Sequence, residues 1–226
     1  MTPQEYLAFE RASETKHEYV DGEIFAMSGG TREHSLVGTS VRMTPQEYLA
    51  FERTSETKHE YIDGEIFAMS GGTFEHSLLA QNIARELGNA LFDRPCTVHG
   101  SDLKVKVAPL ERYFYPDALV VRGPAELEDE SRDVLLNPNV IVEVLSRSTR
   151  NYDRGDKFAS YQAIESLQEY VLLSQTEVRV EHYSRQRDGS WIYRSIGAGG
   201  ELALPSIECV IAVDRVYAKV FPAKGA

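Results

Sequence analysis

The chain has 226 residues, of which 42% are hydrophobic and 26% charged, and its formal net charge is −11. This length suits one domain with a sizeable core, and the acidic balance argues against broad, nonspecific binding to nucleic acid or to an anionic membrane. The sequence has no apolar run that could span a bilayer, no signal-peptide pattern, and two cysteines without metal-ligand or disulfide spacing. We therefore expect a reduced, cytoplasmic protein with no membrane partner, which could bind nucleic acid only through a local basic groove.

The first residues of the chain are duplicated. Residues 1–36 recur almost unchanged as residues 43–78, and the two copies differ only in the pairs Ala12/Thr54, Val20/Ile62 and Arg32/Phe74. Repeat architectures need several units with atypical ends. Two near-identical copies followed by unrelated sequence therefore indicate a recent local duplication, with an artefact of gene assembly as the alternative.

Each copy predicts a short helix followed by a β-hairpin. In the second copy, Thr44 is a suitable N-cap, Pro45 suits the first helical position, and Glu47 completes a capping box. The run HEYI-DG-EIFAM then predicts two strands joined by a two-residue Asp-Gly turn. The first copy repeats these features within residues 2–27.

Different sequence comes after each of the two copies. Residues 75–92 carry apolar side chains at helical spacing, whereas the first copy runs into VGTSVR, which is too short for such a helix. We therefore expect the second copy to open a main domain, residues 43–226, and residues 1–42 to form a surplus helix-hairpin unit. The exposed hairpin of this unit could add to a sheet edge or swap between chains, so a homodimer is expected.

The remainder of the chain alternates strand and helix patterns. Strand candidates cover residues 97–107, 112–121, 140–146, 169–174, 178–184 and 191–197, and a helix is predicted across residues 153–164. This order indicates an α/β or α+β fold, in which helices pack on a strand-rich sheet.

Two acidic residues interrupt neighbouring apolar strand candidates. Glu143 shares a strand face with Ile141 and Leu145, and Asp117 follows Pro116 in the preceding strand candidate. If these strands pair, both acids open onto one crevice, where one carboxyl pKa rises unless a cation lies between them. Mg²⁺ suits such a site because it binds few carboxylates, several waters and a substrate phosphate. Each acid alone is explained as well by a structural ion pair or a turn cap, but the pair favours a metal site.

Basic residues follow the apolar strand 140–146. The local basic cluster that nucleic-acid binding requires is made up of Arg147, Arg150, Arg154 and Lys157. The alternative is a helix start with ordinary solvated charges. Lys157 lies beside the apolar stripe of its predicted helix, which turns it toward the sheet. The alternative for Lys157 is a pair with Asp153, four residues earlier.

Glu60 and His76 are weaker candidates for a functional site. Glu60 shares a predicted strand face with Ile62, so its side chain is expected to point inward. His76 opens the apolar stripe of the predicted helix 75–92, where we expect a hydrogen-bonded core histidine rather than a ligand.

Several segments of the chain resemble a known family. They are HEYIDGEI, EHSLLAQNIARELG, YFYPDALVV, NPNVIVEVLSRSTRNYDRGDKFASYQAI and EYVLLS, in this order. Together they resemble the Uma-two family of restriction endonucleases, a group abundant in cyanobacteria and placed in the PD-(D/E)XK nuclease superfamily. The resemblance runs from Met43 to the end of the chain and implies a restriction-endonuclease-like fold, a mixed β-sheet flanked by helices.

The resemblance assigns catalytic roles to individual residues. Asp117, preceded by Pro116, matches the PD aspartate, and Glu143 matches the acid of the second half-motif. The usual lysine two residues after that acid is replaced by Leu145. In the family a lysine of the following helix takes this role, and Lys157 matches it.

The resemblance also assigns supporting roles. Glu60 matches the family's catalytic acid in the N-terminal hairpin, and His76 matches its histidine at the next helix start. Tyr161 is a further supporting residue, and the main-chain carbonyl of Val144 is a further metal ligand.

These matches together imply a nuclease. The implied reaction is hydrolysis of a nucleic-acid phosphodiester, with DNA as the expected substrate, by water activated on Mg²⁺ or Mn²⁺. Two other functions stay open: a nuclease-fold module that binds nucleic acid without cutting it, and an assembly protein that dimerises through the duplicated hairpin.

Overall fold

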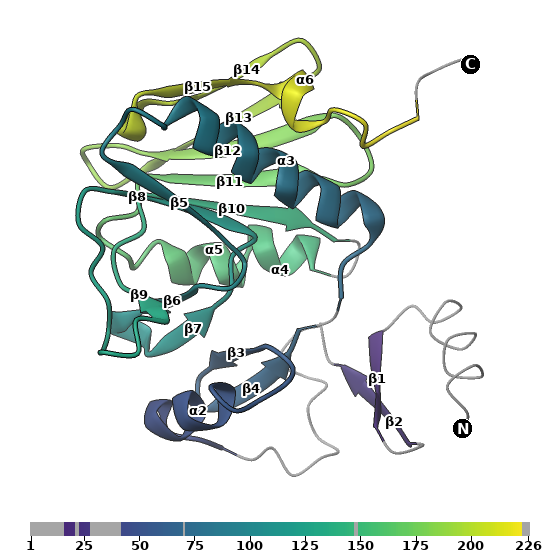
Figure 1. Cartoon of the computed structure of the whole chain (residues 1–226), viewed down its shortest axis with the longest axis vertical. Coiled ribbons are helices and arrows are strands. Elements are labelled where there is room, and N and C mark those ends of the chain that lie inside the picture. Colours follow the sequence, from purple (N-terminus) through teal and green to yellow (C-terminus); the bar gives the residue numbers. More distant parts are fainter. Residues whose placement is uncertain (1–15, 21–22, 28–41, 70, 147–148, 223–226) are drawn as a thin grey trace.

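The computed structural model of the chain describes residues 16–20, 23–27, 42–69, 71–146 and 149–222. Within these residues the strands form a six-stranded sheet, a five-stranded sheet and two two-stranded sheets. Helix α3 (Phe74–Ala90) crosses one face of the six-stranded sheet, and the shorter helices α4 (Arg150–Arg154) and α5 (Asp156–Tyr161) lie on the other (Figure 1). None of the described helices is long and apolar enough to cross a membrane.

The six-stranded sheet has the order β13-β12-β11-β10-β8-β5, in which only β10 and β11 run parallel. The central strands β10 and β11 are buried at every position, which explains why their sequences are mostly apolar. The strands are β5 (Cys96–Gly100), β8 (Ala118–Arg122), β10 (Val140–Leu145), β11 (Glu169–Ser174), β12 (Arg179–Arg185) and β13 (Trp191–Gly197).

The five-stranded sheet has the order β4-β3-β7-β6-β9. It combines the hairpin of the second copy with three strands from the middle of the chain, and helix α2 (Pro45–Glu52) packs beside it (Figure 1). The strands are β3 (His59–Ile62), β4 (Glu65–Ala68), β6 (Lys104–Val107), β7 (Arg112–Phe114) and β9 (Val134–Leu135), and the short 3₁₀ helix η1 (Ala108–Leu110) joins β6 to β7.

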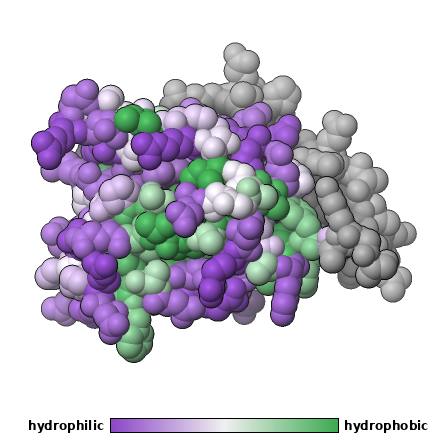
Figure 2. Space-filling view, turned by 90° about the horizontal axis from the view of Figure 1, so that it is seen from above, coloured by the Kyte–Doolittle hydropathy of each residue, from purple (hydrophilic) through white to green (hydrophobic). Residues whose placement is uncertain are grey.

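Two apolar layers lie on opposite faces of the six-stranded sheet. Along β10, Val140, Val142 and Val144 pack toward α3, whereas Ile141 and Leu145 pack toward α5. The α3 layer is completed by β14 (Glu201–Leu204), η2 (Pro205–Ile207), β15 (Cys209–Ala212) and α6 (Val213–Val216). Figure 2 looks onto the face formed by these last elements, where hydrophobic side chains lie among hydrophilic ones. The predicted fold class, a mixed sheet flanked by helices, is confirmed.

Two predicted strands are each divided between two sheets. The candidate 97–107 forms β5 and β6, and the candidate 112–121 forms β7 and β8, so the expectation of single strands was wrong. The chain passes from the five-stranded to the six-stranded sheet at Tyr115 and Pro116, where proline lacks the N–H that a continuing ladder needs. As a result Asp117 lies just before β8 and not inside a strand.

The helix predicted across residues 153–164 is also divided. Gly155 separates α4 from α5 with a ψ angle of −102°, far from the helical region. A Cβ at this position would lie 3.0 Å from the main-chain oxygen of Asn151. The apolar spacing of Phe158 and Tyr161 places α5 on the sheet but gives no sign of the break. Strands β9, β14 and β15 were not expected either.

The second copy forms the predicted elements. Thr44 caps α2 in a complete capping box with Glu47, and Pro45 stands in the first turn. Asp63 and Gly64 both have positive φ angles, 52° and 93°, as a two-residue turn of this type requires. In the first copy, β1 (Lys16–Val20) and β2 (Glu23–Met27) pair in antiparallel fashion.

The helix predicted in the first copy lies outside the described residues. The surplus helix-hairpin unit at residues 1–42, and the boundary that separates it from residues 43–226, therefore stay predictions.

We expect Thr44→Ala to lower the free energy of unfolding by about 1 kcal/mol, because it removes the N-cap of α2 and half of the capping box. Thr54→Ala is the matched control, since the exposed Thr54 hydroxyl bonds only to the nearby main-chain oxygen of Phe51. Its effect should stay within roughly 0.5 kcal/mol. Urea unfolding of both variants measures the difference, and equal losses would contradict the role given to the cap.

Candidate active site

Asp117 and Glu143 lie side by side where β8 and β10 meet. These strands are antiparallel, and Ala118 lies opposite Val142. The next position along each strand places Asp117 opposite Glu143. Asp117 Oδ2 accepts a hydrogen bond of 2.7 Å from the main-chain N–H of Val144. The two acids predicted to share a crevice are thus brought together by strand pairing.

Lys157 joins Glu143 to the second copy. Its Nζ lies 2.9 Å from Glu143 Oε1 and 2.8 Å from Glu60 Oε1, and only 4% of the residue is exposed. Tyr161, one turn later on α5, donates a 3.0 Å hydrogen bond to the same Glu143 oxygen. The described ion pairs of Lys157 therefore run to these two glutamates and not to Asp153, the alternative partner on its own helix.

Glu60 enters the site from β3. Glu60 is 9% exposed, and its side chain points inward, as the strand pattern indicated. One buried ammonium group thus connects three elements, β10 and α5 with β3, which lies far earlier in the sequence.

His76 stands at the start of α3 and not in the core. Its Nε2 lies 3.4 Å from Asp117 Oδ1, and 23% of its side chain is exposed. The helix begins at the N-cap Thr73, whose hydroxyl accepts a hydrogen bond from the main-chain N–H of His76. The expectation of a core histidine was wrong because the apolar stripe of α3 begins three residues later, at Leu79.

Asp153 is a further acid of this site, which the sequence pattern suggested only as a partner for Lys157. It lies on α4, and 4% of the residue is exposed. Burial raises the pKa of Asp153, although the nearby charge of Lys157 opposes the rise. Its position four residues before Lys157 was the available signal, but the break at Gly155 hid how the two side chains are placed.

The charges of the site are unbalanced. Burial raises the pKa of Glu143 well above its usual range; Lys157 opposes this rise, whereas Asp117, Asp153 and Glu60 add to it. Burial alone would lower the pKa of Lys157, but Glu143 and Glu60 outweigh it and raise that pKa well above its usual range. Glu143 thus shares the site with three further carboxyl groups and one lysine, and an additional cation would relieve the repulsion among the carboxylates.

The residues at this point fit a cation that keeps part of its water shell. Among the described residues no group of three or more His, Cys, Asp or Glu side chains is arranged to enclose a metal ion. Mg²⁺ usually binds through one or two carboxylates, waters and substrate phosphate, and Asp117 and Glu143 supply such a pair. The contribution of the Val144 carbonyl stays a prediction.

Not all arginines of the predicted basic cluster are free to contact a ligand. Both oxygens of Glu181 accept hydrogen bonds from Arg154, at 2.8 and 2.6 Å, so this guanidinium is already bound to β12. Arg150 is exposed at the start of α4, and Arg147 lies outside the described residues. Contact of these three arginines with nucleic acid stays a prediction.

Comparison with known proteins gives a consistent result. A sequence model of the Uma2 family, described as "Putative restriction endonuclease", matches residues 45–213. The crystal structure of "a putative nuclease belonging to DUF820" from Anabaena variabilis matches with a TM-score of 0.66 at 16% identity, over 79% of this chain and 99% of that chain, which shows a shared fold.

Two proteins of Synechocystis sp. are similar in sequence. The uncharacterized protein slr1290 is 37% identical over 217 residues, which is 96% of this chain and 91% of its own length. The uncharacterized protein sll1609 is 38% identical over 192 residues, 85% of each chain. Both matched spans are longer than residues 43–226, so they extend into the first copy.

We expect the metal-free protein to lose stability relative to Glu143→Gln as the pH rises above about 4.5, the usual pKa of a glutamate. The raised pKa means that the folded state holds a proton that the unfolded chain releases, so folding is favoured below this pH and the advantage is lost as Glu143 ionises. Each unit of pKa displacement corresponds to about 1.4 kcal/mol. Unfolding of both proteins between pH 4 and 8 in the presence of a chelator tests this, and a constant difference would contradict it.

Proposed function

Because this chain belongs to the Uma2 family, described as "Putative restriction endonuclease", we propose that it is a metal-dependent nuclease that hydrolyses phosphodiester bonds of nucleic acid. The observation that carries the proposal is the buried Lys157 between Glu60 and Glu143, with Asp117 beside it. A lysine and two neighbouring acids in a site with excess negative charge are what hydrolysis of a phosphodiester with a metal ion needs.

Asp117 and Glu143 are the residues that would hold Mg²⁺ or Mn²⁺. A metal ion bound there supplies an activated water and positive charge for the phosphate. The main-chain N–H of Val144 fixes the orientation of Asp117, and the hydroxyl of Tyr161 fixes that of Glu143. Both carboxylates are thus oriented before a ligand arrives.

Lys157 supplies a positive charge next to the metal-binding pair. Its ammonium group stays protonated because Glu143 and Glu60 raise its pKa despite burial. A fixed charge in a buried site stabilises the negative charge that develops on phosphate oxygens more strongly than it would in water. Lys157 therefore replaces the lysine that the sequence lacks two residues after Glu143.

Glu60 positions Lys157 from the opposite side. The ammonium group lies 2.8 Å from Glu60 and 2.9 Å from Glu143, so the two carboxyl groups together fix its position. His76 acts in the same way on Asp117, since its ring lies 3.4 Å from the oxygen that does not bond to Val144. In this proposal both are positioning residues.

Substrate binding must overcome the acidic net charge of −11. Arg150, exposed on α4 directly after the Glu143 strand, and Arg147 before it are the proposed phosphate contacts, with DNA as the proposed substrate. Binding through so few cations would depend only weakly on salt, because the slope of log affinity against log salt concentration scales with the number of phosphates neutralised, and it would leave the choice between DNA and RNA to other contacts.

We expect the wild-type protein to cleave nucleic acid in Mn²⁺, and Glu143→Gln and Lys157→Ala to lose about 10²–10³-fold in rate because each removes one source of charge stabilisation. Glu56→Gln, which changes an exposed glutamate in the loop between α2 and β3, is the matched control and should keep full activity. Single- and double-stranded DNA and RNA, assayed in parallel, identify the substrate. A wild-type protein that binds DNA in a salt-sensitive way but cuts none of these would instead support the module that binds without cutting.

We expect Mg²⁺ to raise the thermal midpoint, by roughly 5–10 °C at one hundred times its Kd, because it binds only the folded state. The rise should be larger at pH 8 than at pH 5, since protons compete with the metal for Glu143, whose pKa is raised. Asp117→Asn should abolish it. An identical midpoint with and without the metal at pH 8 would remove the metal from the proposal.

A further inference from the structure

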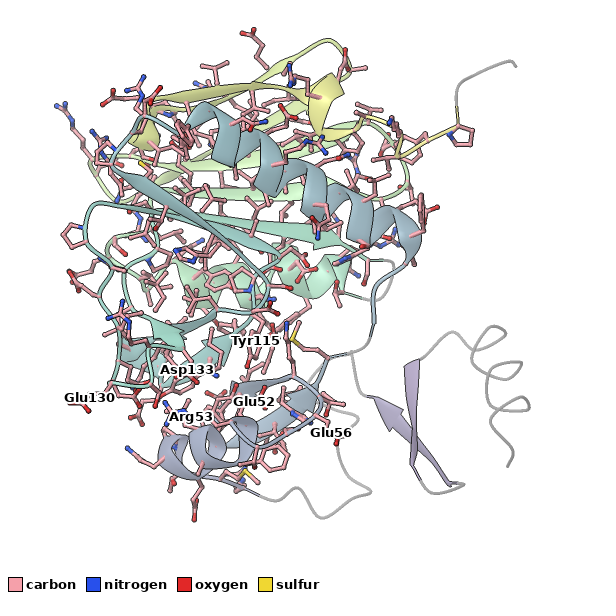
Figure 3. The ribbon with its side chains drawn as sticks, viewed as in Figure 1. Glu52, Arg53, Glu56, Tyr115, Glu130 and Asp133 are labelled. Atoms are coloured by element: carbon pink, nitrogen blue, oxygen red, sulfur yellow. The ribbon has the colours of Figure 1, made fainter. Side chains whose placement is uncertain are left out.

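The second copy, residues 43–69, docks on the rest of the chain through polar contacts and through a buried cluster in which Tyr48 and Tyr61 pack against Tyr113. Arg53 on α2 binds Asp129 at 2.6 Å and Asp133 at 2.9 Å, and Lys58 lies 2.5 Å from Asp102. Figure 3 shows Arg53 directed toward Asp133.

The hairpin of the second copy docks as well. Asp63, in its turn, binds Arg112 through both carboxylate oxygens, at 2.7–3.0 Å. Glu60 binds Lys157, and Tyr61 pairs with Tyr113 of β7.

A buried contact anchors the end of α2. Glu52 accepts a 2.9 Å hydrogen bond from the hydroxyl of Tyr115, and the other contacts of Glu52 are to His59 within the same copy. We call the residues on the receiving side the docking surface: Asp102, Arg112, Tyr113, Tyr115, Asp129, Asp133 and Lys157. Every member belongs to the chain after the duplication.

The first copy carries the same docking residues. Each side chain of the second copy that reaches the docking surface has an identical counterpart forty-two positions earlier. The counterparts of Glu52, Arg53, Lys58, Glu60, Tyr61 and Asp63 are Glu10, Arg11, Lys16, Glu18, Tyr19 and Asp21.

The hairpin of the first copy also has the matching register. In the second copy Glu60 pairs with Phe67 and Ile62 with Glu65. In the first copy the equivalent pairs are Glu18 with Phe25 and Val20 with Glu23. Since register decides which side chains share a face, the two hairpins have the same pairing of equivalent positions.

The three positions that differ between the copies lie away from these polar contacts. Thr54 is exposed and bonds only within its own copy, and Phe74 is 73% exposed. Ile62 packs partly against the apolar layer of α5, so Val20 in its place would lose one methylene group.

We propose that the first copy can bind the docking surface of its own chain in place of the second copy, which puts Glu18 where Glu60 stands. The chain then contains two interchangeable versions of the unit that completes the site around Lys157. The second copy is the main occupant for two reasons. Binding of the first copy closes residues 28–70 into a loop, and the entropy of loop closure disfavours this arrangement by a factor of roughly 10². The first copy also has Val20 in place of Ile62 and so lacks one buried methylene group.

Disabling the second copy should therefore bring the first copy onto the docking surface. Tyr61→Pro removes a main-chain donor and a buried ring from β3, between β4 and β7. Tyr19→Pro makes the same change in the first copy and is the matched control.

Zero-length carbodiimide cross-linking of the full chain identifies the occupant. Lys58 and Asp102 are in contact and accessible, with side chains 39% and 96% exposed, and the counterpart of Lys58 is Lys16. Peptides of the two copies differ in mass through the pairs Ala12/Thr54 and Val20/Ile62.

We expect Asp102 to be linked to the Lys58 peptide in the wild-type and Tyr19→Pro proteins, and to the Lys16 peptide in Tyr61→Pro. No Lys16 link in Tyr61→Pro would overturn the proposal. A Lys16 link found only in species with the mass of two chains would overturn it too, because the occupant would then come from another molecule.

Thermal unfolding gives an independent test that needs no nuclease activity. Tyr19→Pro should leave the midpoint unchanged, Tyr61→Pro should lower it modestly, and the double variant should lower it by clearly more than the sum of the single changes. Additive changes would overturn the proposal. Because neither test measures cleavage, a failure here leaves the proposed function standing, and an inactive protein leaves this inference standing.

Discussion

The buried lysine between two glutamates is the interaction on which the rest of this structure depends. Glu143 stands in the middle of a strand that is buried along its whole length, where an uncompensated carboxylate is strongly disfavoured. Lys157 supplies the compensating charge when Glu143 ionises, and Glu143 and Glu60 in turn raise the pKa of Lys157 against the effect of burial. A buried pair is costly to break but is a poor source of stability by itself, which favours a functional reason for its presence.

The path of the chain brings these groups together. The chain crosses from the five-stranded to the six-stranded sheet at Tyr115 and Pro116. Asp117 therefore lies directly before β8, beside Glu143. The break at Gly155 lets α5 begin as a separate helix at Asp156, one residue before Lys157. Both departures from regular secondary structure lie next to the candidate site, where locally irregular backbone is expected to serve function.

The second copy completes the site from outside. Its hairpin supplies Glu60, and its attachment combines surface ion pairs, one short strand pairing with Tyr61 opposite Tyr113, and a buried cluster in which Tyr48 and Tyr61 pack against Tyr113. The residues that make these contacts, Tyr48 and Tyr61 among them, recur unchanged in the first copy as Tyr6 and Tyr19, which is the basis of the proposed exchange. The duplication therefore affects the site itself and not only the N-terminal end of the chain.

Apolar periodicity, capping residues and the Asp-Gly turn determined the elements of this protein from the sequence alone: α2, α3, the second hairpin and the central strands stand where the pattern placed them, and the motif residues indicated the family. Only the tertiary structure decided that residues 97–107 and 112–121 each serve two sheets, that Asp153 joins the site, that His76 faces Asp117, and that Arg154 is bound to Glu181. Local pattern reports which face of an element is buried, whereas the partner of a charged side chain depends on groups that are distant in the sequence and meet only when the sheets pair.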